Sequence, residues 1–379
     1  MKIAVTTLAF CVAALLALGM VMLYSSSMAK DGAQLLMMQT VWCALGVVGC
    51  MLAAALDYRV LRKLVWPIFI FSIILLVLVL LPLPHGITKK INGAHRWFIF
   101  PGFRLQPSEL GKLAMIFALA WYAERSQRLM HTWWRGILVP GLIIAPILGL
   151  IFIEPDRGTT ILMTAVSGAM LLIAGVRWKF IVPPALLALV GLVISIVHDP
   201  MRMKRIFSWL DLENTKTGVG MQAYQAMLAL GSGGWTGLGL GNGRQKLGFV
   251  PEHHTDFIFS VIGEELGLIT TLLVVLAFVV LVICGVYIAL HARDTFGFML
   301  ACGITFLIGL QAFINIGVVT SALPNKGLPL PFISYGGSNL LAMLGCVGLL
   351  FSVARQARES GPVLNDALAT DELPFGQAT

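Results

Sequence analysis

Apolar residues occupy this chain in long blocks, and short polar segments separate one block from the next. A helix needs about 20 mostly apolar residues to cross a hydrocarbon layer of roughly 30 Å, because each helical residue advances about 1.5 Å. The blocks therefore predict an all-α integral membrane protein with about ten transmembrane helices. The predicted spans cover residues 5–24, 35–56, 65–82, 107–124, 137–154, 157–175, 180–198, 257–288, 297–321 and 335–355.

The longest polar interruption lies between the seventh and eighth spans, over residues 199–256, and predicts a large extracytoplasmic loop. An even number of spans places both termini on the same side of the membrane. We expect one polytopic membrane domain over residues 1–358, followed by a disordered cytoplasmic tail over residues 359–379. The first block resembles a signal peptide, but no small-residue cleavage site follows it, so we interpret it as a retained helix.

Composition supports the membrane interpretation and excludes a soluble globular domain. Hydrophobic residues make up 58% of the chain, charged residues only 12%, and the mean hydropathy is +0.89. The 6 cysteines all lie in predicted spans, and none forms a CxxC pair. We therefore expect them to fill apolar space and not to form disulfides or bind a metal.

The chain carries 26 Lys and Arg against 18 Asp and Glu, but these cations divide almost equally between the two sides of the predicted topology. Short loops decide the orientation, because cytoplasmic loops retain positive charge and long loops carry little weight. Compact basic clusters at residues 59–63, 177–179 and 355–358 place both termini in the cytoplasm. The opposite side then has an unusual excess of cations, which indicates an anionic ligand there. Lipid headgroups are the alternative partner, above all for Lys89 and Lys90.

The segment from Gln106 to Lys112 places two opposite charges at the start of a span. Pro107 suits a first helical turn, and Glu109 and Lys112 then share one helix face just inside the membrane. An ionisable side chain at this depth is costly unless it is paired or lines a wet cavity. Both a mutual ion pair and a substrate cavity fit the spacing. We favour the cavity, because further charges recur at the same depth.

Those further charges lie in two other connecting segments. The turn at residues 154–159 carries Glu154 and Asp156 at the membrane edge, where Asp156 either caps the next helix or faces the cavity. Pro and Gly break the connector at residues 323–338. Irregular backbone at membrane depth is tolerated only where protein packs around it or where it lines a cavity. We expect this connector to form a cavity wall, with Lys326 available to an anion.

The large loop contains an amphipathic stretch near residues 220–230 and a glycine-rich run at residues 231–243. The run matches neither the dinucleotide fingerprint nor a Walker A sequence, so we expect no nucleotide or organic cofactor. It either holds an anion through its backbone amides or serves as a flexible lid.

Asp256 ends the large loop and leads directly into an apolar helix. Partial loss of water at this boundary makes a carboxylate a stronger base, so Asp256 is a candidate general base. Together with His253 and His254 it forms a possible metal site, although no second ligand cluster accompanies these residues. We therefore do not expect a cage of protein ligands alone, and we leave a divalent cation, Mg²⁺ or Mn²⁺, open as a cofactor.

These segments, in this order, resemble the SEDS family of shape, elongation, division and sporulation proteins, and the resemblance runs from Tyr24 to about Arg358. Residues 240–247, 262–265 and 323–327 are most similar to its cell-division branch, because the elongation branch usually lacks the lysine of the last segment. The chain departs from the family pattern where Glu154 replaces a common Gln, Arg157 a common Leu, and Ser338-Asn339 a pair of serines.

The resemblance implies a peptidoglycan glycosyltransferase that polymerises lipid II into β-1,4 glycan strands at the outer face of the bacterial cytoplasmic membrane. The reaction would release undecaprenyl pyrophosphate, and the branch implies septal cell-wall synthesis during cell division. The implied partners are lipid II, the nascent glycan strand, a class B penicillin-binding transpeptidase and the membrane proteins of the divisome. A nucleic-acid partner is not expected.

The resemblance also implies a set of site residues. Asp256 corresponds to the essential catalytic aspartate of the family, and Lys326 corresponds to its connector lysine. The pyrophosphate leaving group needs cations on the extracytoplasmic side. The predicted substrate-binding residues are Glu109, Lys112, Asp156, Lys326, Arg96, Gln106 and Arg205, with Arg202 as an alternative to Arg205.

Other functions fit the same pattern. A lipid II flippase also suits many spans, broken helices and charges within the membrane, although the sequence shows no obvious inverted repeat. A noncatalytic scaffold that recruits a transpeptidase would tolerate loss of the charged residues. Within the family itself, the elongation polymerase is the alternative.

Overall fold

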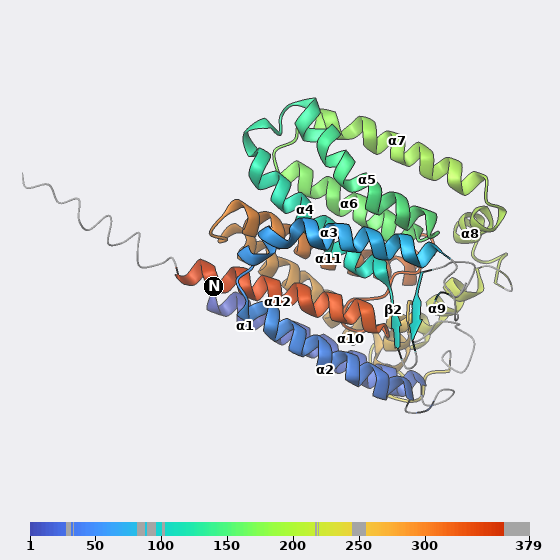
Figure 1. Ribbon diagram of the computed structural model, residues 1–379. Coiled ribbons are helices and arrows are strands. Elements are labelled where there is room, and N and C mark those ends of the chain that lie inside the picture. Colours follow the sequence, from blue (N-terminus) through green and yellow to red (C-terminus); the bar gives the residue numbers. More distant parts are fainter. Residues whose placement is uncertain are drawn as a thin grey trace, which may run out of the picture.

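The computed structural model describes residues 1–27, 32, 34–81, 88, 96–100, 103–216, 218, 220–244 and 255–359. It is a bundle of long helices with one small hairpin (Figure 1). Every predicted span is a helix, with ends close to the predicted ones. These helices are α1 (Lys2–Ser27), α2 (Gln34–Ala55), α3 (Arg59–Leu80), α4 (Pro107–Ser126), α5 (Val139–Ile153), α6 (Arg157–Ile173), α7 (Trp178–Val197), α10 (Ile258–Leu290), α11 (Thr295–Val319) and α12 (Gly337–Glu359).

By length and composition, 8 of the described helices can cross a membrane, fewer than the number of spans predicted. The remaining predicted spans are α4 and α6. Helix α6 has only 17 residues, and the 20 residues of α4 include Glu109, Lys112, Glu124 and Arg125. Helix α4 packs against α3, α5, α6, α11 and α12. Protein surrounds Glu109 and Lys112 in place of lipid, and these charges make the apolar pattern of α4 weaker than that of its neighbours.

Helix α1 begins and helix α12 ends at the same end of the bundle (Figure 1). Two short helices, η2 (Gln127–Leu129) and η3 (Trp134–Leu138), precede α5. The opposite end carries the segments that connect α7 to α10, and we call it the loop end. It contains α8 (Pro200–Leu210) and α9 (Met221–Ser232), so the amphipathic stretch predicted in the large loop is a helix. It also contains an antiparallel hairpin of β1 (Phe98–Phe100) and β2 (Phe103–Leu105) in an otherwise all-α fold.

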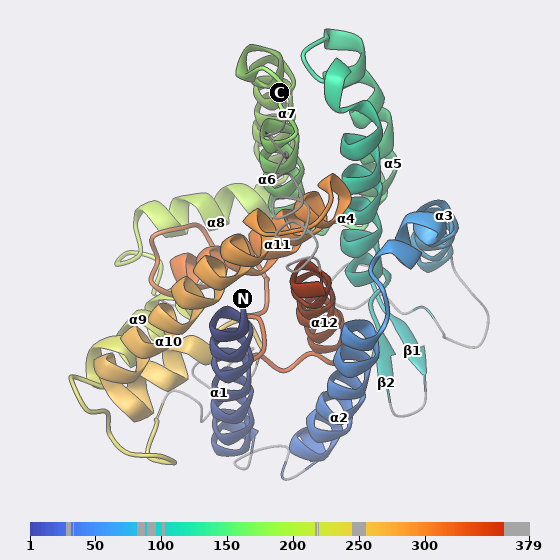
Figure 2. The same cartoon turned by 90° about the vertical axis from the view of Figure 1, so that its left-hand side faces the viewer.

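Helices α4, α11 and α12 lie at the centre of the bundle (Figure 2). In the span of α11, 67% of the residues are buried, and in that of α12, 72%. The span of α7 has 0% buried residues, and α7 packs against α8 and η3 at the edge of the molecule. Polar side chains within these helices, such as Lys112, Gln311 and Asn339, are surrounded by protein, which is the condition for placing charges at this depth.

The glycine-rich run packs against a break in α10. Gly267 has a φ of 77°, which interrupts the helix, and a side chain at this position would collide with the backbone of Trp235 and Thr236. Leu268 N donates a hydrogen bond to Gly234 O at 2.9 Å. Glycine is thus required where the run and the broken helix approach each other.

Two carboxylates of α10 accept hydrogen bonds from the end of the same run and from the residue that follows it. Glu264 Oε1 accepts from Arg244 N at 2.8 Å, and Glu265 Oε2 accepts from Gly241 N at 3.1 Å and from Ser25 Oγ at 2.6 Å. The Gly241 and Arg244 amides are thus bonded to protein carboxylates. Anion binding and a flexible lid both stay predictions for the run.

Candidate active site

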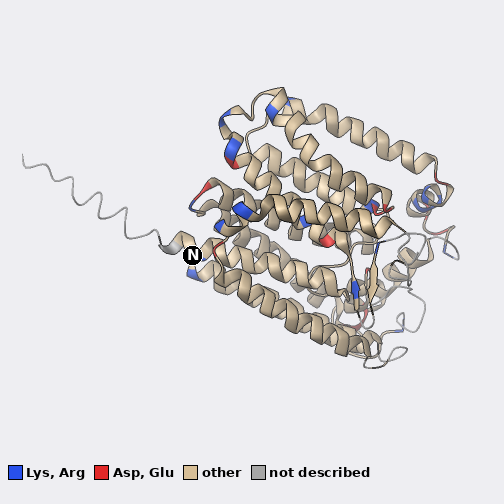
Figure 3. Ribbon diagram, viewed as in Figure 1, with Lys and Arg blue, Asp and Glu red and all other residues tan. Residues whose placement is uncertain are grey.

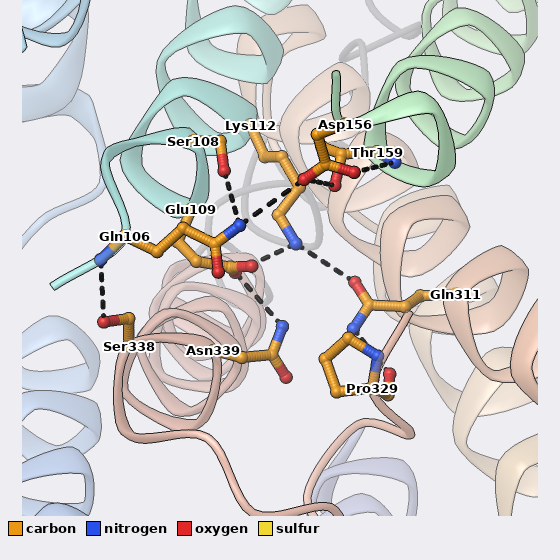
Figure 4. Close-up of polar contacts among 10 residues, drawn as sticks. All are labelled: Gln106, Ser108, Glu109, Lys112, Asp156, Thr159, Gln311, Pro329, Ser338 and Asn339. Atoms are coloured by element: carbon orange, nitrogen blue, oxygen red, sulfur yellow. Dashed lines mark hydrogen bonds and ion pairs between the residues drawn. The ribbon is translucent and has the colours of Figure 1, made fainter. Parts of the chain in front are cut away.

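Glu109 and Lys112 form an ion pair near the start of α4 (Figure 4). Lys112 Nζ lies 2.9 Å from Glu109 Oε2, and only 1% of the lysine side chain and 7% of the glutamate side chain are exposed. Asn339 Nδ2 donates a hydrogen bond to the same carboxylate oxygen at 3.1 Å. Of the two interpretations drawn from the sequence, the structure contains the ion pair, and the lysine ammonium does not face an open cavity.

Gln311 on α11 links this ion pair to the connector between α11 and α12. Its Oε1 accepts a hydrogen bond from Lys112 Nζ at 3.1 Å, and its Nε2 donates to Pro329 O at 2.9 Å (Figure 4). The side chain is fully buried, so both ends of the amide are satisfied inside the protein. Gln311 was not among the residues predicted from the sequence. The signal that would have found it is a polar amide within an apolar span.

Asp256 lies just before α10 and directly beside the connector. A Cβ atom at Gly327 would lie 2.9 Å from Asp256 Oδ2, so this glycine lets the connector backbone approach the carboxylate. Asn315 on α11, also missed from the sequence, donates from Nδ2 to Asp256 O at 2.8 Å and to Leu328 O at 2.7 Å. The Asp256 carboxylate therefore lies against the connector at Gly327, the residue that follows Lys326.

Asp156 is the N-cap of α6, as one of the two interpretations proposed. Its carboxylate accepts hydrogen bonds from Thr159 N at 3.1 Å and from Thr159 Oγ1 at 3.0 Å. Gln106 Nε2 lies 3.5 Å from Asp156 Oδ2, and Gln106 N donates to Ser338 Oγ at 3.1 Å. These contacts tie the starts of α4, α6 and α12 together (Figure 4). Ser338 and Asn339, where the chain departs from the family pattern, thus both contact predicted site residues.

Glu154 lies in the turn before α6, and its carboxylate is fully buried. Neither side-chain oxygen has a hydrogen-bond partner among the described residues. Burial, followed by the negative charge of Asp156, raises the pKa of Glu154 to about 8, and the positive charge of Arg96 opposes this shift. Arg96 Nε donates to Glu154 O at 3.1 Å and Arg96 Nη2 to Pro155 O at 2.6 Å. Arg96 therefore holds the backbone of the turn.

Arg205 and Lys326 belong to one group of cations. Burial lowers the pKa of Lys326, and the positive charges of Arg157, Arg202 and Arg205 lower it further. Lys326 lies in the connector, Arg157 begins α6, and the two other arginines belong to α8. Figure 3 shows the basic residues of α8 at the loop end. Lys112 is not part of this group, because Glu109 neutralises it inside the bundle.

Several predicted features lie outside the described residues. They are Lys89 and Lys90, the pair His253 and His254, residues 245–247 and the tail from residue 360 onward. Within the part that the structure describes, no group of three or more His, Cys, Asp or Glu is placed to hold a metal ion. The described side chains alone do not fit a divalent-cation site, and the cation stays a prediction.

Known proteins similar to this chain point to one family. The family model of the cell cycle proteins FtsW, RodA and SpoVE matches residues 6–359. The probable peptidoglycan glycosyltransferase FtsW of Trichlorobacter lovleyi is 42% identical over 349 residues, which cover 90% of this chain and 91% of that protein. Stage V sporulation protein E of Bacillus subtilis is 39% identical over 351 residues, which cover 91% of this chain and 95% of that protein.

Solved structures share the fold. One is a chain of a peptidoglycan synthase complex whose structure was described for the coordination of polymerization and crosslinking. It matches with a TM-score of 0.77 at 30% identity, and the match covers 92% of this chain and 97% of that chain. The crystal structure of the rod shape determining protein RodA of Thermus thermophilus matches with a TM-score of 0.69 at 29% identity, over 92% of this chain and 96% of that chain. The all-α multi-pass architecture predicted from the sequence is confirmed.

Proposed function

The chain belongs to the SEDS family, that of the cell cycle proteins FtsW, RodA and SpoVE, and from this premise we propose that it is a peptidoglycan glycosyltransferase. It polymerises lipid II into β-1,4 glycan strands and releases undecaprenyl pyrophosphate. One observation carries the proposal. The Asp256 carboxylate lies at the loop end against the connector at Gly327, the residue that follows the half-buried Lys326, so a candidate base adjoins the segment that carries a cation.

Asp256 is the general base in this proposal. A sugar hydroxyl of the acceptor gives its proton to the Asp256 carboxylate, and the oxygen attacks the anomeric carbon of the donor. The bond between that carbon and the diphosphate oxygen breaks, and its electron pair leaves with undecaprenyl pyrophosphate. A single in-line displacement inverts the anomeric carbon, so an α-linked donor gives a β-linked strand. Lipid tails hold donor and acceptor at the membrane surface, which supplies part of the rate through orientation.

The buried polar residues of the site have a positioning role. Gln311 joins the Glu109–Lys112 pair to the connector, and Asn315 joins Asp256 to the same connector. A connector held in this way keeps the base and Lys326 at fixed positions before substrate arrives, which is the condition for electrostatic catalysis. We propose this role for the ion pair in place of direct contact with the substrate.

The proposal places the loop end at the outer face of the bacterial cytoplasmic membrane and both termini in the cytoplasm. The compact basic clusters at the opposite end of the bundle support this orientation, because short cytoplasmic loops retain positive charge. Relatives named FtsW support a role in cell division at the septum.

The proposed partner is a class B penicillin-binding transpeptidase. Support comes from the peptidoglycan synthase complex described for coordination of polymerization and crosslinking, since one of its chains shares this fold. A polymerase that works beside a crosslinking enzyme hands over a strand as it is made. Divisome membrane proteins are further proposed partners.

Purified protein in proteoliposomes that contain lipid II tests the function, with and without a class B transpeptidase. The expected product is a ladder of glycan strands on a gel, and a chelator in a parallel reaction reports whether a divalent cation is needed. A flippase would move labelled lipid II across the bilayer and form no strands. That result, obtained with the transpeptidase present, would refute the proposal.

A further inference from the structure

Three arginines and three tryptophans are exposed at the end of the bundle opposite the loop end. They lie in two segments, residues 127–138 between α4 and α5 and residues 174–180 between α6 and the first turn of α7. Figure 3 shows basic residues at this end of the bundle. We call these six side chains the Arg/Trp surface, which consists of Arg128, Trp133, Trp134, Arg135, Arg177 and Trp178.

Tertiary contacts join the two segments that carry the Arg/Trp surface. The rings of Trp133 and Phe180 pack edge to face, with their centroids 5.8 Å apart, and η3 packs against α7. Tyr122 on α4 donates a hydrogen bond from its hydroxyl to Arg135 O at 2.6 Å, which attaches the first segment to the end of α4. The surface is therefore built from both segments and is not a run of basic residues on one helix.

The three arginines have no negative charges beside them in the sequence. Neither of the two segments contains an aspartate or a glutamate. Among the described residues, none of these arginines forms a salt bridge. Glu124, the acid that precedes the first segment, already pairs with Arg62, whose Nη2 lies 2.7 Å from Glu124 Oε1. The Arg/Trp surface thus carries positive charge that protein carboxylates do not neutralise.

The tryptophans indicate the level of the lipid headgroups. Trp133, Trp134 and Trp178 are 45%, 64% and 73% exposed. Indole rings favour the boundary between membrane and water, because one edge is polar and the rest of the ring is apolar. Helix α7 begins at this boundary, and none of the residues in its span is buried, so lipid covers it. The Arg/Trp surface is therefore continuous with a face of the protein that meets acyl chains.

We propose that the Arg/Trp surface binds the phosphate of an anionic phospholipid, in the leaflet at this end of the bundle. In the proposed orientation this is the cytoplasmic leaflet. The planar donors of arginine match phosphate oxygens, and cations beside a membrane surface attract anionic headgroups. The indole rings lie against the glycerol region, and the acyl chains continue along α7. The site lies at the opposite end of the bundle from Asp256, and the inference does not depend on the reaction.

Native mass spectrometry of the full-length protein in detergent, titrated with phosphatidylglycerol or phosphatidylcholine, measures this binding. Phosphatidylglycerol should bind at least about tenfold more tightly, a difference of about 1.4 kcal/mol. Arg135→Gln combined with Arg177→Gln should remove that preference and leave binding of phosphatidylcholine unchanged. Arg135→Lys combined with Arg177→Lys keeps both charges and should retain part of the preference. Arg104→Gln is the matched control, because Arg104 is an exposed arginine of β2 at the loop end, and it should bind phosphatidylglycerol like the wild type.

Thermal unfolding provides a second measurement. The substituted arginines are exposed, so the double glutamine variant should unfold at the wild-type temperature in lipid-free detergent. Added phosphatidylglycerol should raise the midpoint of the wild type more than that of the variant.

Four results would overturn the inference. Equal affinity for the two lipids would mean that the headgroup charge is not recognised, and an undiminished preference in the double glutamine variant would place the site elsewhere. Displacement of phosphatidylglycerol by millimolar inorganic phosphate would mean a site for a soluble anion. Binding of a polyglutamate peptide without binding of phosphatidylglycerol would mean that an acidic protein occupies the Arg/Trp surface.

Discussion

Lys112 Nζ lies 2.9 Å from Glu109 Oε2 in the centre of the helix bundle, and the pair is almost completely sealed from its surroundings. Two neutral amides complete the arrangement, since Gln311 accepts from the lysine and Asn339 donates to the glutamate. A buried ion pair of this kind contributes little net stability compared with apolar residues, but removal of one partner leaves an unpaired buried charge. In this fold the ion pair and its two amide partners hold α4, α11 and α12 together around the connector.

Loss of the lysine alone should therefore be severe. Lys112→Met leaves the Glu109 carboxylate unpaired and should lower the free energy of unfolding by about 3–5 kcal/mol. The double variant Glu109→Gln with Lys112→Met should recover part of this loss, because no charge remains to be paired. Thermal unfolding in detergent measures both. Lys179→Met, at an exposed cation, should change stability by less than about 0.5 kcal/mol. A single variant as stable as the wild type would show that the pair does not hold the bundle.

Asn315 should affect turnover more than substrate affinity. Asn315→Leu removes the donors to Asp256 O and Leu328 O, so the base and the connector lose their common anchor. Misplacement of a reacting group by about 1 Å costs up to about 100-fold in rate. We expect kcat to fall while KM changes little, measured by lipid II polymerisation. Gln127→Leu, at an exposed amide in η2, is the matched control. Equal losses in both variants, or a change confined to KM, would contradict the positioning role.

Glu154 should make stability depend on pH. Its pKa is about 8 in the folded protein against an ordinary value of 4.5, so the folded state binds the proton more tightly than the unfolded state does. Stability is then greatest below pH 4.5 and is lost as pH rises toward 8, by up to about 1.4 kcal/mol per pH unit.

The variant Glu154→Gln should remove this slope and be more stable than the wild type at pH 8, with little difference at pH 5. Unfolding midpoints measured across this range provide the test. Glu213→Gln replaces an exposed carboxylate of the large loop and should leave the slope as it is. An identical pH profile for Glu154→Gln and the wild type would show that the carboxylate is not buried as described.

Two glycines in helices should respond in opposite ways to alanine. Gly267 has a positive φ and lies against the backbone of the glycine-rich run, so Gly267→Ala should destabilise the protein by more than about 1 kcal/mol. Gly141 lies in α5 with open space around its Cβ position, and Gly141→Ala should be neutral or stabilising by up to about 1 kcal/mol. Unfolding midpoints of the two variants in one detergent check this. Tolerance of alanine at residue 267 would mean that the run does not pack against α10.

Long apolar blocks made the membrane helices predictable, because the bilayer requires them wherever a helix meets lipid. The same requirement explains where the structure differs from the prediction. Helix α4 packs among other helices, so its sequence can carry charges and predicts a membrane span only weakly. The strands of the hairpin from Phe98 to Leu105 are too short to show a clear alternation of apolar and polar residues. The charged residues of the site were predictable because ionisable groups are rare at this depth.

The sequence could not show how those charges are divided. Lys112 and Lys326 were both predicted to bind the substrate, but Lys112 is paired inside the bundle and Lys326 lies half-buried in the connector. Which lysine forms an ion pair with a carboxylate depends on tertiary packing, which the spacing of residues in the sequence does not determine. Gln311 and Asn315 were missed because a neutral amide in an apolar span leaves a weak trace in the sequence, although its hydrogen bonds hold the site together.

The rate of lipid II polymerisation by Asp256→Asn, with the transpeptidase partner present, tests the central claim most directly. Loss of a general base costs about 10²–10⁴-fold, so strand synthesis should fall by that factor while undecaprenyl diphosphate still binds. Asp211→Asn, which changes an exposed acid of the large loop, should polymerise at the wild-type rate. Wild-type synthesis by the Asp256→Asn variant would contradict the account.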